Sequence, residues 1–253
     1  MEPDNNLKFD YYPSLKNAIT IYKNSKALYY NGFSKVVPDK NTDFIVTYTG
    51  IQTRHRTAHI ESPFDKIGIV FKELGINHFI DIPLSHISSF DIDMSFDYFG
   101  EQFHIYCNSL FNNLSPEERV SILDHFFEKN FTNFQEERLK KSVALILNST
   151  EKITVKEISG ILGIDRKTLL RLFKLHLGCT VKDFIDIARF RSSLNQYLSN
   201  ADKSSLTKVA IDSNFYDQAQ YIHHFKKFTG NNPKNIFRSI SRLGEENTFW
   251  TFD

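Results

Sequence analysis

DRKTLLRLFKLHLG, residues 165–178, and DQAQYIHHFKKFTG, residues 217–230, repeat one pattern within a single chain of 253 residues. Each stretch begins with an Asp, which suits a helix N-cap, and ends with a Gly, which suits a helix C-cap. Their large apolar residues have the i, i+4, i+7 spacing of a buried helical stripe; they are Leu169, Phe173, Tyr221, Phe225 and Phe228. Each stretch is therefore predicted to form an amphipathic helix with a polar outer face.

A shorter predicted helix and a sharp turn precede each copy. Ile158 and Val209 lie in these short helices and are expected to pack under the stripes. The turns carry Gly163 and Asn214, the two residue types that most readily adopt a positive φ. A plain helical repeat would share this core pattern, but a capped, exposed second helix after a four-residue turn favours DNA recognition. The chain thus predicts two tandem helix-turn-helix units, over residues 155–178 and 206–230.

Charge divides the chain into two opposed halves. Residues 139–253 hold 18 Lys and Arg against 11 Asp and Glu, a net charge of +7, whereas residues 1–138 hold 13 against 19, a net charge of −6. A basic half attracts phosphate through counterion release, and an acidic half does not. The charge distribution therefore agrees with DNA binding by the C-terminal half, although solvated surfaces also acquire such charge by chance.

Several classes of protein do not fit the composition. No stretch is long and apolar enough to span a bilayer, and the N-terminus lacks the basic start and apolar run of a secretory signal, so we expect a cytoplasmic protein without membrane contact. The two cysteines, Cys107 and Cys179, are too few for a disulfide framework or a Cys-rich zinc site. We interpret both as buried small apolar residues, and no cofactor is expected.

The first half has the pattern of a small antiparallel β structure. Alternating or β-branched segments, separated by Gly, Pro, Asn and Asp, predict strands at Ala27–Phe33, Phe44–Thr49, Arg56–Ile60 and Lys66–Phe71. The first dozen residues are expected to form a weakly ordered tail.

Helices follow the predicted strands. A short one is expected over Lys72–Phe79 and longer ones over Phe99–Phe111, Ser115–Phe131 and Gln135–Asn148; Ser115 and Pro116 provide an N-cap and an N1 proline. A connecting helix over Thr180–Leu198 is expected to fix the spacing of the two units through Phe184, Ile187, Ala188 and Leu194. The predicted class is α+β: a small β-rich domain with flanking helices (1–134), then an all-α domain of two helix-turn-helix units joined by this helix (135–244), and a C-terminal tail (245–253).

From about Leu139 to Arg242 the chain resembles the DNA-binding domain of AraC/XylS-type transcriptional regulators. The signature portion is FYDQAQY (215–221) followed by FKKFTGNNP (225–233), which is similar to the family pattern GF-x-DQ-x-x-(F/Y)…FK-x-x-x-G-x-x-P. Asn214 stands where the family usually has Gly, and Asn still permits a left-handed turn. Over KIGIVF (66–71), Gly75 and IPLS (82–85), a shorter and looser match, the N-terminal half is similar to the sensor-like domain of one subgroup.

The outward residues near the start of each second helix are placed to contact base edges in the major groove. They are Arg166, Lys167, Leu170 and Arg171 in the first unit, and Gln218, Ala219, Ile222 and His223 in the second. The resemblance implies base contact for all of these except Arg166. Arg171 suits a guanine and Gln218 an adenine, whereas Leu170, Ala219 and Ile222 suit thymine methyl groups. The alternative for any one of them is a solvated surface residue.

Cations farther along the helices are assigned to phosphate or to structure. These are Lys174, Lys226, Lys227, Arg189 and Arg191, and Arg189 is also a candidate for an internal salt bridge. The resemblance implies that the two helices enter successive major grooves on one DNA face, roughly 34 Å apart.

The N-terminal half leaves several interpretations open. Eight of the eleven tyrosines lie before residue 110, which suits either an aromatic-lined pocket for a small-molecule effector or an aromatic core. His55 and His59, four residues apart, invite a metal site and a cupin-like metal-dependent enzyme, but no third ligand stands at suitable spacing. A third interpretation is an interaction module or homodimer interface, which exposed Phe103, Phe111, Phe127 or Phe131 would favour.

The sequence therefore predicts a non-enzymatic, sequence-specific transcription regulator whose partner is double-stranded DNA. No nucleophile elbow, phosphate loop or paired-carboxylate motif points to catalysis. An activator of this kind would also contact RNA polymerase. The effector, the target sequence and the direction of regulation stay open at this point.

Overall fold

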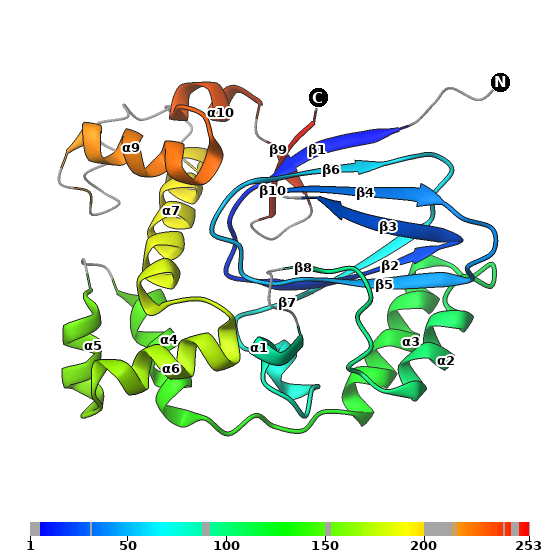
Figure 1. Ribbon diagram of the computed structural model, residues 1–253, viewed down its shortest axis with the longest axis horizontal. Helices are drawn as coiled ribbons and strands as arrows, with labels where there is room; N and C mark the ends of the chain where they lie inside the picture. Colours follow the sequence, from blue (N-terminus) through cyan, green and yellow to red (C-terminus); the bar gives the residue numbers. More distant parts are fainter. Residues whose placement is uncertain are drawn as a thin grey trace.

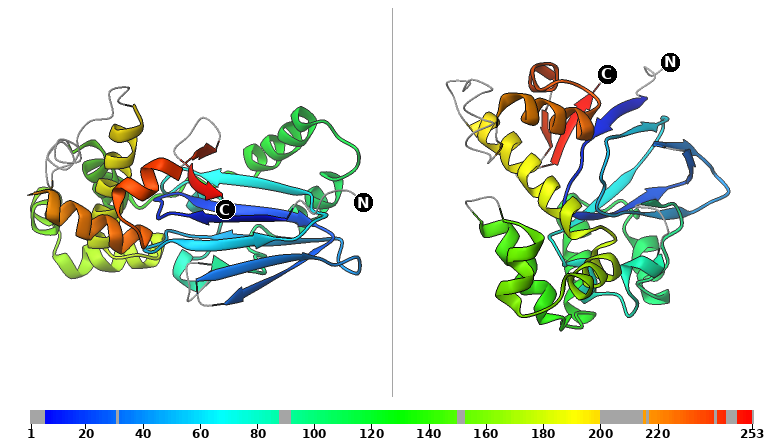
Figure 2. Two further views of the ribbon diagram at one scale, coloured as in Figure 1. Left: turned by 90° about the horizontal axis from the view of Figure 1, so that it is seen from above. Right: turned by 60° about the vertical axis from the view of Figure 1, so that its left-hand side comes forward.

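Two β-sheets with flanking helices form the N-terminal part, and the helices of the C-terminal part lie to one side of them (Figures 1 and 2). The computed structural model describes residues 6–30, 32–87, 92–149, 153–199, 215, 217–239, 241–243 and 248–252. The α+β class predicted from the sequence is confirmed.

The first sheet has the strand order β3-β4-β6-β1-β10-β9, and the second has the order β7-β2-β5-β8. In the described residues, neighbouring strands are antiparallel, as expected, except for β4 and β6, which are parallel. The bounds in the first sheet are β1 Leu7–Tyr11, β3 Ser25–Tyr30, β4 Phe33–Pro38, β6 Arg56–Ile60, β9 Ser241–Leu243 and β10 Thr248–Phe252. Those in the second are β2 Asn17–Lys23, β5 Phe44–Thr49, β7 Lys66–Phe71 and β8 Ile92–Asp93.

Both ends of the chain join the first sheet, although the sequence suggested tails there. β1 pairs with β6 on one side and with β10 on the other, aligning Phe9 with Ala58 and Phe252. The expected weakly ordered N-terminal tail was therefore wrong from Leu7 onward. Phe9 faces the core while its neighbour Asp10 accepts a hydrogen bond from Thr57 Oγ1 at 2.6 Å, so the alternation of polar and aromatic residues there is that of a strand.

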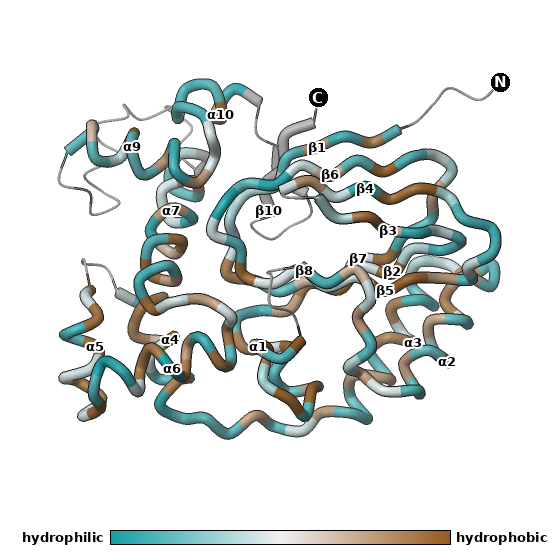
Figure 3. Tube along the Cα trace, in the orientation of Figure 1, coloured by the Kyte–Doolittle hydropathy of each residue, from teal (hydrophilic) through white to brown (hydrophobic). Residues whose placement is uncertain are grey.

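The strands bury residues on both faces of the second sheet. Along several strands the trace alternates between hydrophobic and hydrophilic residues (Figure 3). Tyr22 and Ile60 belong to the cluster between the sheets. Ile19 and Ile21 belong to a larger cluster that packs against α2 (Glu101–Ser109) and α3 (Pro116–Lys129). Helices therefore cover the face of the second sheet that the first sheet leaves open.

The helix predicted over Lys72–Phe79 is reduced to a single 3-10 turn, η1 (Ile76–His78), so that expectation was wrong in extent. Leu74 has a φ of 64°, which interrupts the right-handed helical geometry just before η1. A short helix, α1 (Leu84–Ile87), follows η1.

The C-terminal helices begin and end close to the predicted positions, except for the last one, which was not predicted. They are α4 Glu137–Asn148, α5 Val155–Leu162, α6 Arg166–Leu177, α7 Val181–Ser199, α9 Gln218–Thr229 and α10 Pro233–Ser239. Their core is continuous with the N-terminal part, because Tyr12, Leu15, Ile51 and Leu74 belong to the same buried cluster as the stripes of α6 and α9.

Candidate nucleic-acid interface

The first helix-turn-helix unit consists of α5, a turn at Gly163 and α6. Gly163 has a φ of 62°, as the sharp turn requires. Asp165 caps α6 by accepting hydrogen bonds from the backbone amides of Lys167 at 2.8 Å and Thr168 at 2.9 Å. Leu169, Phe173 and Ile158 are fully buried, so the stripe of α6 packs over α5 as predicted.

The second unit places α9 with the same local geometry. Asp217 accepts a hydrogen bond from the backbone amide of Gln220 at 2.7 Å, and Gly230 ends the helix with a φ of 71°. The predicted stripe of Tyr221, Phe225 and Phe228 is buried. The predicted first helix and turn of this unit, with Leu206, Val209 and Asn214, lie outside the described residues.

We call the outward side chains of α6 and α9 the two recognition faces. On α6, Arg166, Lys167, Leu170, Arg171 and Lys174 are all exposed. On α9, Gln218, Ala219, His223 and Lys226 are exposed and Ile222 is half-buried. Every predicted DNA-contacting residue is therefore at least partly exposed on its helix.

Helix α7 packs against both units and so connects them, as Figure 2 shows. Thr180 starts it: its hydroxyl accepts a hydrogen bond from the amide of Asp183 at 3.0 Å. The Phe184 ring lies 5.4 Å from that of Phe173 in the first unit. The Phe190 ring lies 5.2 Å from that of Phe225 in the second. The predicted role of this helix in spacing the units thus has a physical basis in buried aromatic contacts.

The remaining cations divide into exposed and structural groups. Arg191 is buried and its guanidinium donates to the carbonyl of Pro13 at 3.5 Å, so it supports the fold. Arg189 lies over the Phe215 ring at 4.2 Å. Lys227 Nζ lies 3.9 Å from an Asp186 carboxylate oxygen, whereas Lys174 and Lys226 are exposed on the recognition helices.

Two carboxyl groups near these helices, those of Asp186 and Asp165, have lowered pKa values. Burial alone would raise the pKa of Asp186, but the His224 ring, whose Nε2 lies 3.5 Å from Oδ1, and the nearby positive charges outweigh it and lower that pKa. Hydrogen bonds from Thr168, side chain first and then backbone, lower the pKa of Asp165. Both carboxylates therefore stay ionised at neutral pH.

One further helix lies beside the second unit. Helix α10 begins at Asn232-Pro233, and Asn232 Oδ1 accepts from the amide of Asn235 at 3.1 Å. Lys234 and Arg238 on this helix are exposed. These cations were not among the predicted phosphate-binding residues, although Asn232 followed by Pro233 is a helix start signal.

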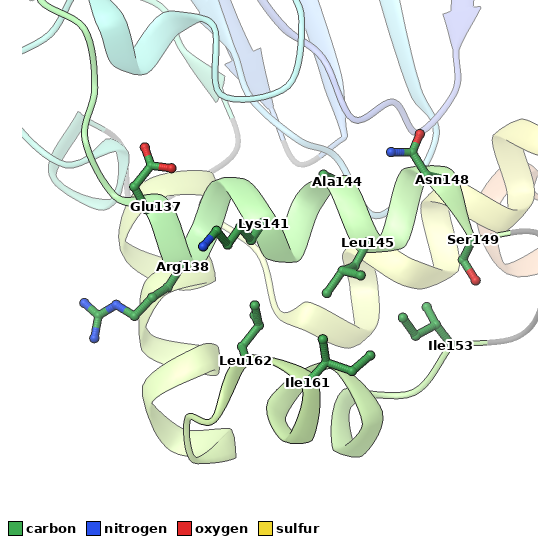
Figure 4. Close-up of a pocket in the computed structure, with 10 residues that line it drawn as sticks. All are labelled: Glu137, Arg138, Lys141, Ala144, Leu145, Asn148, Ser149, Ile153, Ile161 and Leu162. Carbon is green, nitrogen blue, oxygen red and sulfur yellow. The ribbon is translucent and has the colours of Figure 1, made fainter.

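Two surface cavities adjoin the first unit. An open groove of about 700 Å³ runs between α4 and α5, with Arg138, Lys141 and Leu145 facing Ile161 and Leu162 (Figure 4). A second cavity of about 330 Å³ is lined by one face of α6 and by Ser85 of α1; the α6 residues are Lys167, Leu170, Arg171, Lys174 and Leu175. Neither cavity is lined by the N-terminal tyrosines, of which Tyr22 and Tyr48 are buried in the cores.

The alternative N-terminal sites are not assembled in the described part of the chain. His55 approaches Gly230, where a Cβ would lie 2.8 Å from His55 Cε1, so it contacts the second unit. Within the described ranges, no three His, Cys, Asp or Glu side chains gather into a candidate metal site. Phe103 and Phe111 are buried, and only Phe131 among the four proposed interface phenylalanines is strongly exposed.

No helix in the described ranges is both long and apolar enough to cross a membrane.

Comparison with known proteins identifies the C-terminal part and the fold. A family model described as a helix-turn-helix domain, of the AraC type, matches residues 158–239. The structure of ToxT from Vibrio cholerae superposes with a TM-score of 0.50 at 14% identity, covering 92% of this chain and 96% of ToxT. A transcriptional regulator with an AraC-type DNA-binding domain from Chromobacterium violaceum matches at 22% identity over 36% of this chain and 80% of its own, with a TM-score of 0.33.

None of the curated proteins compared with this sequence matches it. The family match covers both recognition helices, and the likeness to ToxT extends over nearly the whole chain and shows the shared fold. The matched domain is one that transcription regulators carry. Residues 158–239 thus form an AraC-type helix-turn-helix domain, the kind of domain with which transcription regulators bind DNA.

Proposed function

We propose that α6 and α9 enter successive major grooves of one DNA duplex and recognise two different half-sites. The observation that carries this proposal is that α6 and α9 have the same caps and a similar buried stripe but different exposed side chains. Both helices have an Asp N-cap, a left-handed Gly C-cap and a buried stripe, yet their recognition faces share no residue type except the outer lysines, Lys174 and Lys226. A chain built in this way recognises an asymmetric target.

The dimensions of α7 support the proposal. Its 19 residues span about 28 Å at 1.5 Å per residue, which is close to the repeat of roughly 34 Å between successive major grooves. Because Phe184 packs on the first unit and Phe190 on the second, this helix joins the two units through buried contacts.

Within each recognition face we assign roles by chemistry. Arg171 pairs with a guanine, while Leu170 contacts a thymine methyl group. Gln218 pairs with an adenine, while Ala219 and Ile222 contact thymine methyl groups. The other base-contacting side chains are Arg166, Lys167 and His223. Lys174 and Lys226 bind phosphate and contribute affinity without sequence preference.

We assign DNA binding to residues 135–244 and regulation to residues 1–134. Support for a regulatory N-terminal part comes from its contacts with both units: the backbone amide of His55 donates to the carbonyl of Phe228 at 3.0 Å, and Asn77 Nδ2 donates to the carbonyl of His176 at 3.0 Å. A small-molecule effector, a homodimer and contact with RNA polymerase stay predictions.

Selection of bound sequences from random double-stranded DNA tests the proposal. The expected result is a consensus of two dissimilar half-sites whose centres lie about 10 base pairs apart. A palindromic consensus, or a single short site, would contradict it. Repeating the selection with Gln218→Ala should degrade one half of the consensus and leave the other unchanged.

A further inference from the structure

Helix α1 of the N-terminal part lies beside α6 of the first helix-turn-helix unit (Figure 1). Leu84 and Ile87 are buried in the core beneath the second sheet and anchor α1 there. Ser85, between them, is exposed and lines the 330 Å³ cavity together with α6. The N-terminal core therefore presents one side of α1 to the first unit.

The α6 residues in this cavity belong to its recognition face. They lie at positions i, i+3, i+4, i+7 and i+8, which share one side of a helix; they are Lys167, Leu170, Arg171, Lys174 and Leu175. Ser85 thus stands over the same side chains to which we assign base and phosphate contacts. These side chains are in contact with solvent, but they also adjoin Ser85 of the N-terminal part.

A major groove cannot accept α6 in this arrangement. The groove is about 12 Å wide, and an α-helix with its side chains is about 10–12 Å across, so there is room for one helix. A second helix packed against the recognition side would meet the groove wall before α6 reached the base edges. The obstruction is steric and does not depend on the DNA sequence.

We propose that α1 is an autoinhibitory element, which lies against the recognition face of α6 and must separate from it before the first unit can bind DNA. The inference rests on the proposed role of α6 in DNA recognition. It goes further by assigning α1 a function and by predicting that the two units differ, because α1 packs against α6 of the first unit.

Contacts at the C-terminal end of α6 hold this helix against the N-terminal part. The carbonyl of His176 accepts the hydrogen bond from Asn77 of η1, and the Phe134 ring lies 5.0 Å from the His176 ring. Asn77 is buried, so its side chain loses a protein partner when α6 moves away. The measured DNA affinity is then the intrinsic affinity reduced by the fraction of molecules in which α1 has separated.

A charge placed on α1 tests the contact. Ser85→Lys brings a like charge against Lys167, Arg171 and Lys174 and should favour separation. His86→Lys is the matched control, because His86 is exposed on the same helix but does not line the cavity. Both variants add one positive charge, so general attraction to DNA cancels in the comparison. We expect Ser85→Lys to bind DNA about two- to fivefold more tightly than His86→Lys, the range of exposed charge pairs. Equal affinities would contradict the inference.

A reversible crosslink between α1 and α6 tests the inference by preventing their separation. The variant with Ser85→Cys and Leu175→Cys is joined by a cleavable bismaleimide, which closes α1 onto α6. The native thiols should not compete: Cys107 and Cys179 are buried, and burial raises the pKa of the Cys107 thiol to about 12. Each single-cysteine variant, treated in the same way, is the control.

Crosslinking should reduce affinity for the selected DNA at least about tenfold, and cleaving the linker should restore it; such a loss corresponds to about 1.4 kcal/mol. Unchanged affinity in the crosslinked protein would overturn the inference while leaving the proposed function intact. Absence of sequence-specific binding before crosslinking would overturn the proposed function, and with it the role of α1.

Discussion

At the scale of single residues, the two helix-turn-helix units have the same capping residues. Asp165 and Asp217 occupy equivalent N-caps, and Gly178 and Gly230 occupy equivalent left-handed C-caps. These positions decide where each helix begins and ends, and the sequence shows them directly because capping is local. The exposed residues near the start of each helix differ between the copies, and there we expect the difference in specificity.

Arg171 and Lys174 should differ in what they contribute, because one is assigned to a base and the other to phosphate. Arg171→Ala should cost about 1–3 kcal/mol on the preferred site and little on a site changed at its guanine. Lys174→Ala should weaken binding to both DNAs equally and lower the slope of log affinity against log salt by about 1. Anisotropy titrations at several salt concentrations measure both effects; identical losses for the two variants would refute the assignment.

Asp165 should make the first unit sensitive to acid. Its pKa is lowered in the folded chain, mainly by the hydrogen bond from the Thr168 hydroxyl at 2.7 Å. A carboxylate with a lowered pKa stabilises the fold above its ordinary value near 3.9, and this contribution is lost as the pH falls through the lowered value. NMR titration of the Asp165 carboxyl should show a smaller depression in Thr168→Val. An unaltered titration would mean that Thr168 is not the cause.

At the scale of elements, the proposed recognition of two half-sites depends on α7. It carries Phe184 against the first unit and Phe190 against the second, and both rings are fully buried. Its amphipathic pattern and Thr180 start are visible in the sequence. The division of its contacts between the two units follows from the length of the helix.

Phe184→Ala and Phe190→Ala should therefore act on different halves of the DNA. Each removes a buried ring and should lower the free energy of unfolding by about 3–5 kcal/mol. Under conditions where both variants remain folded, hydroxyl-radical footprints should weaken over the α6 half-site for Phe184→Ala and over the α9 half-site for Phe190→Ala. Chemical denaturation checks the stability, and matching footprints would show that α7 does not couple the units separately.

The strands show where prediction from sequence succeeds and where it stops. β5, β6 and β7 have the predicted bounds, because their apolar and β-branched runs end at clear turn residues. β1 was missed because its alternation is only five residues long, and β10 because its partner, β1, lies more than two hundred residues away. The stripes, caps and recognition faces followed from local periodicity. The position of α1 against α6 did not, because it depends on how separate cores pack.

At the scale of the whole molecule, the N-terminal part holds both units. η1 and α1 contact α6, while His55 contacts the end of α9 and β10 returns to pair with β1. Four N-terminal apolar residues enter the core of the C-terminal helices; they are Tyr12, Leu15, Ile51 and Leu74. The recognition helices therefore do not move independently of the sheets in this arrangement.

Gly230 offers a direct probe of that coupling. Its φ of 71° should make Gly230→Ala cost about 1–2 kcal/mol, and the new Cβ would also lie 2.8 Å from His55 Cε1. Gly178→Ala is the matched control, since Gly178 has a φ of 69° and open space around it. Thermal denaturation should show a larger loss for Gly230→Ala, and His55→Ala should remove the excess. An equal loss at both glycines would argue against the contact.

The central claim is that α6 and α9 recognise different halves of one site. It is tested most directly by measuring the affinities of the wild type, Arg171→Ala and Gln218→Ala for the selected DNA and for two versions of it, each altered in one half-site. We predict that Arg171→Ala loses discrimination only at one half and Gln218→Ala only at the other. Loss of discrimination at the same half by both variants, or at neither half, would contradict the claim.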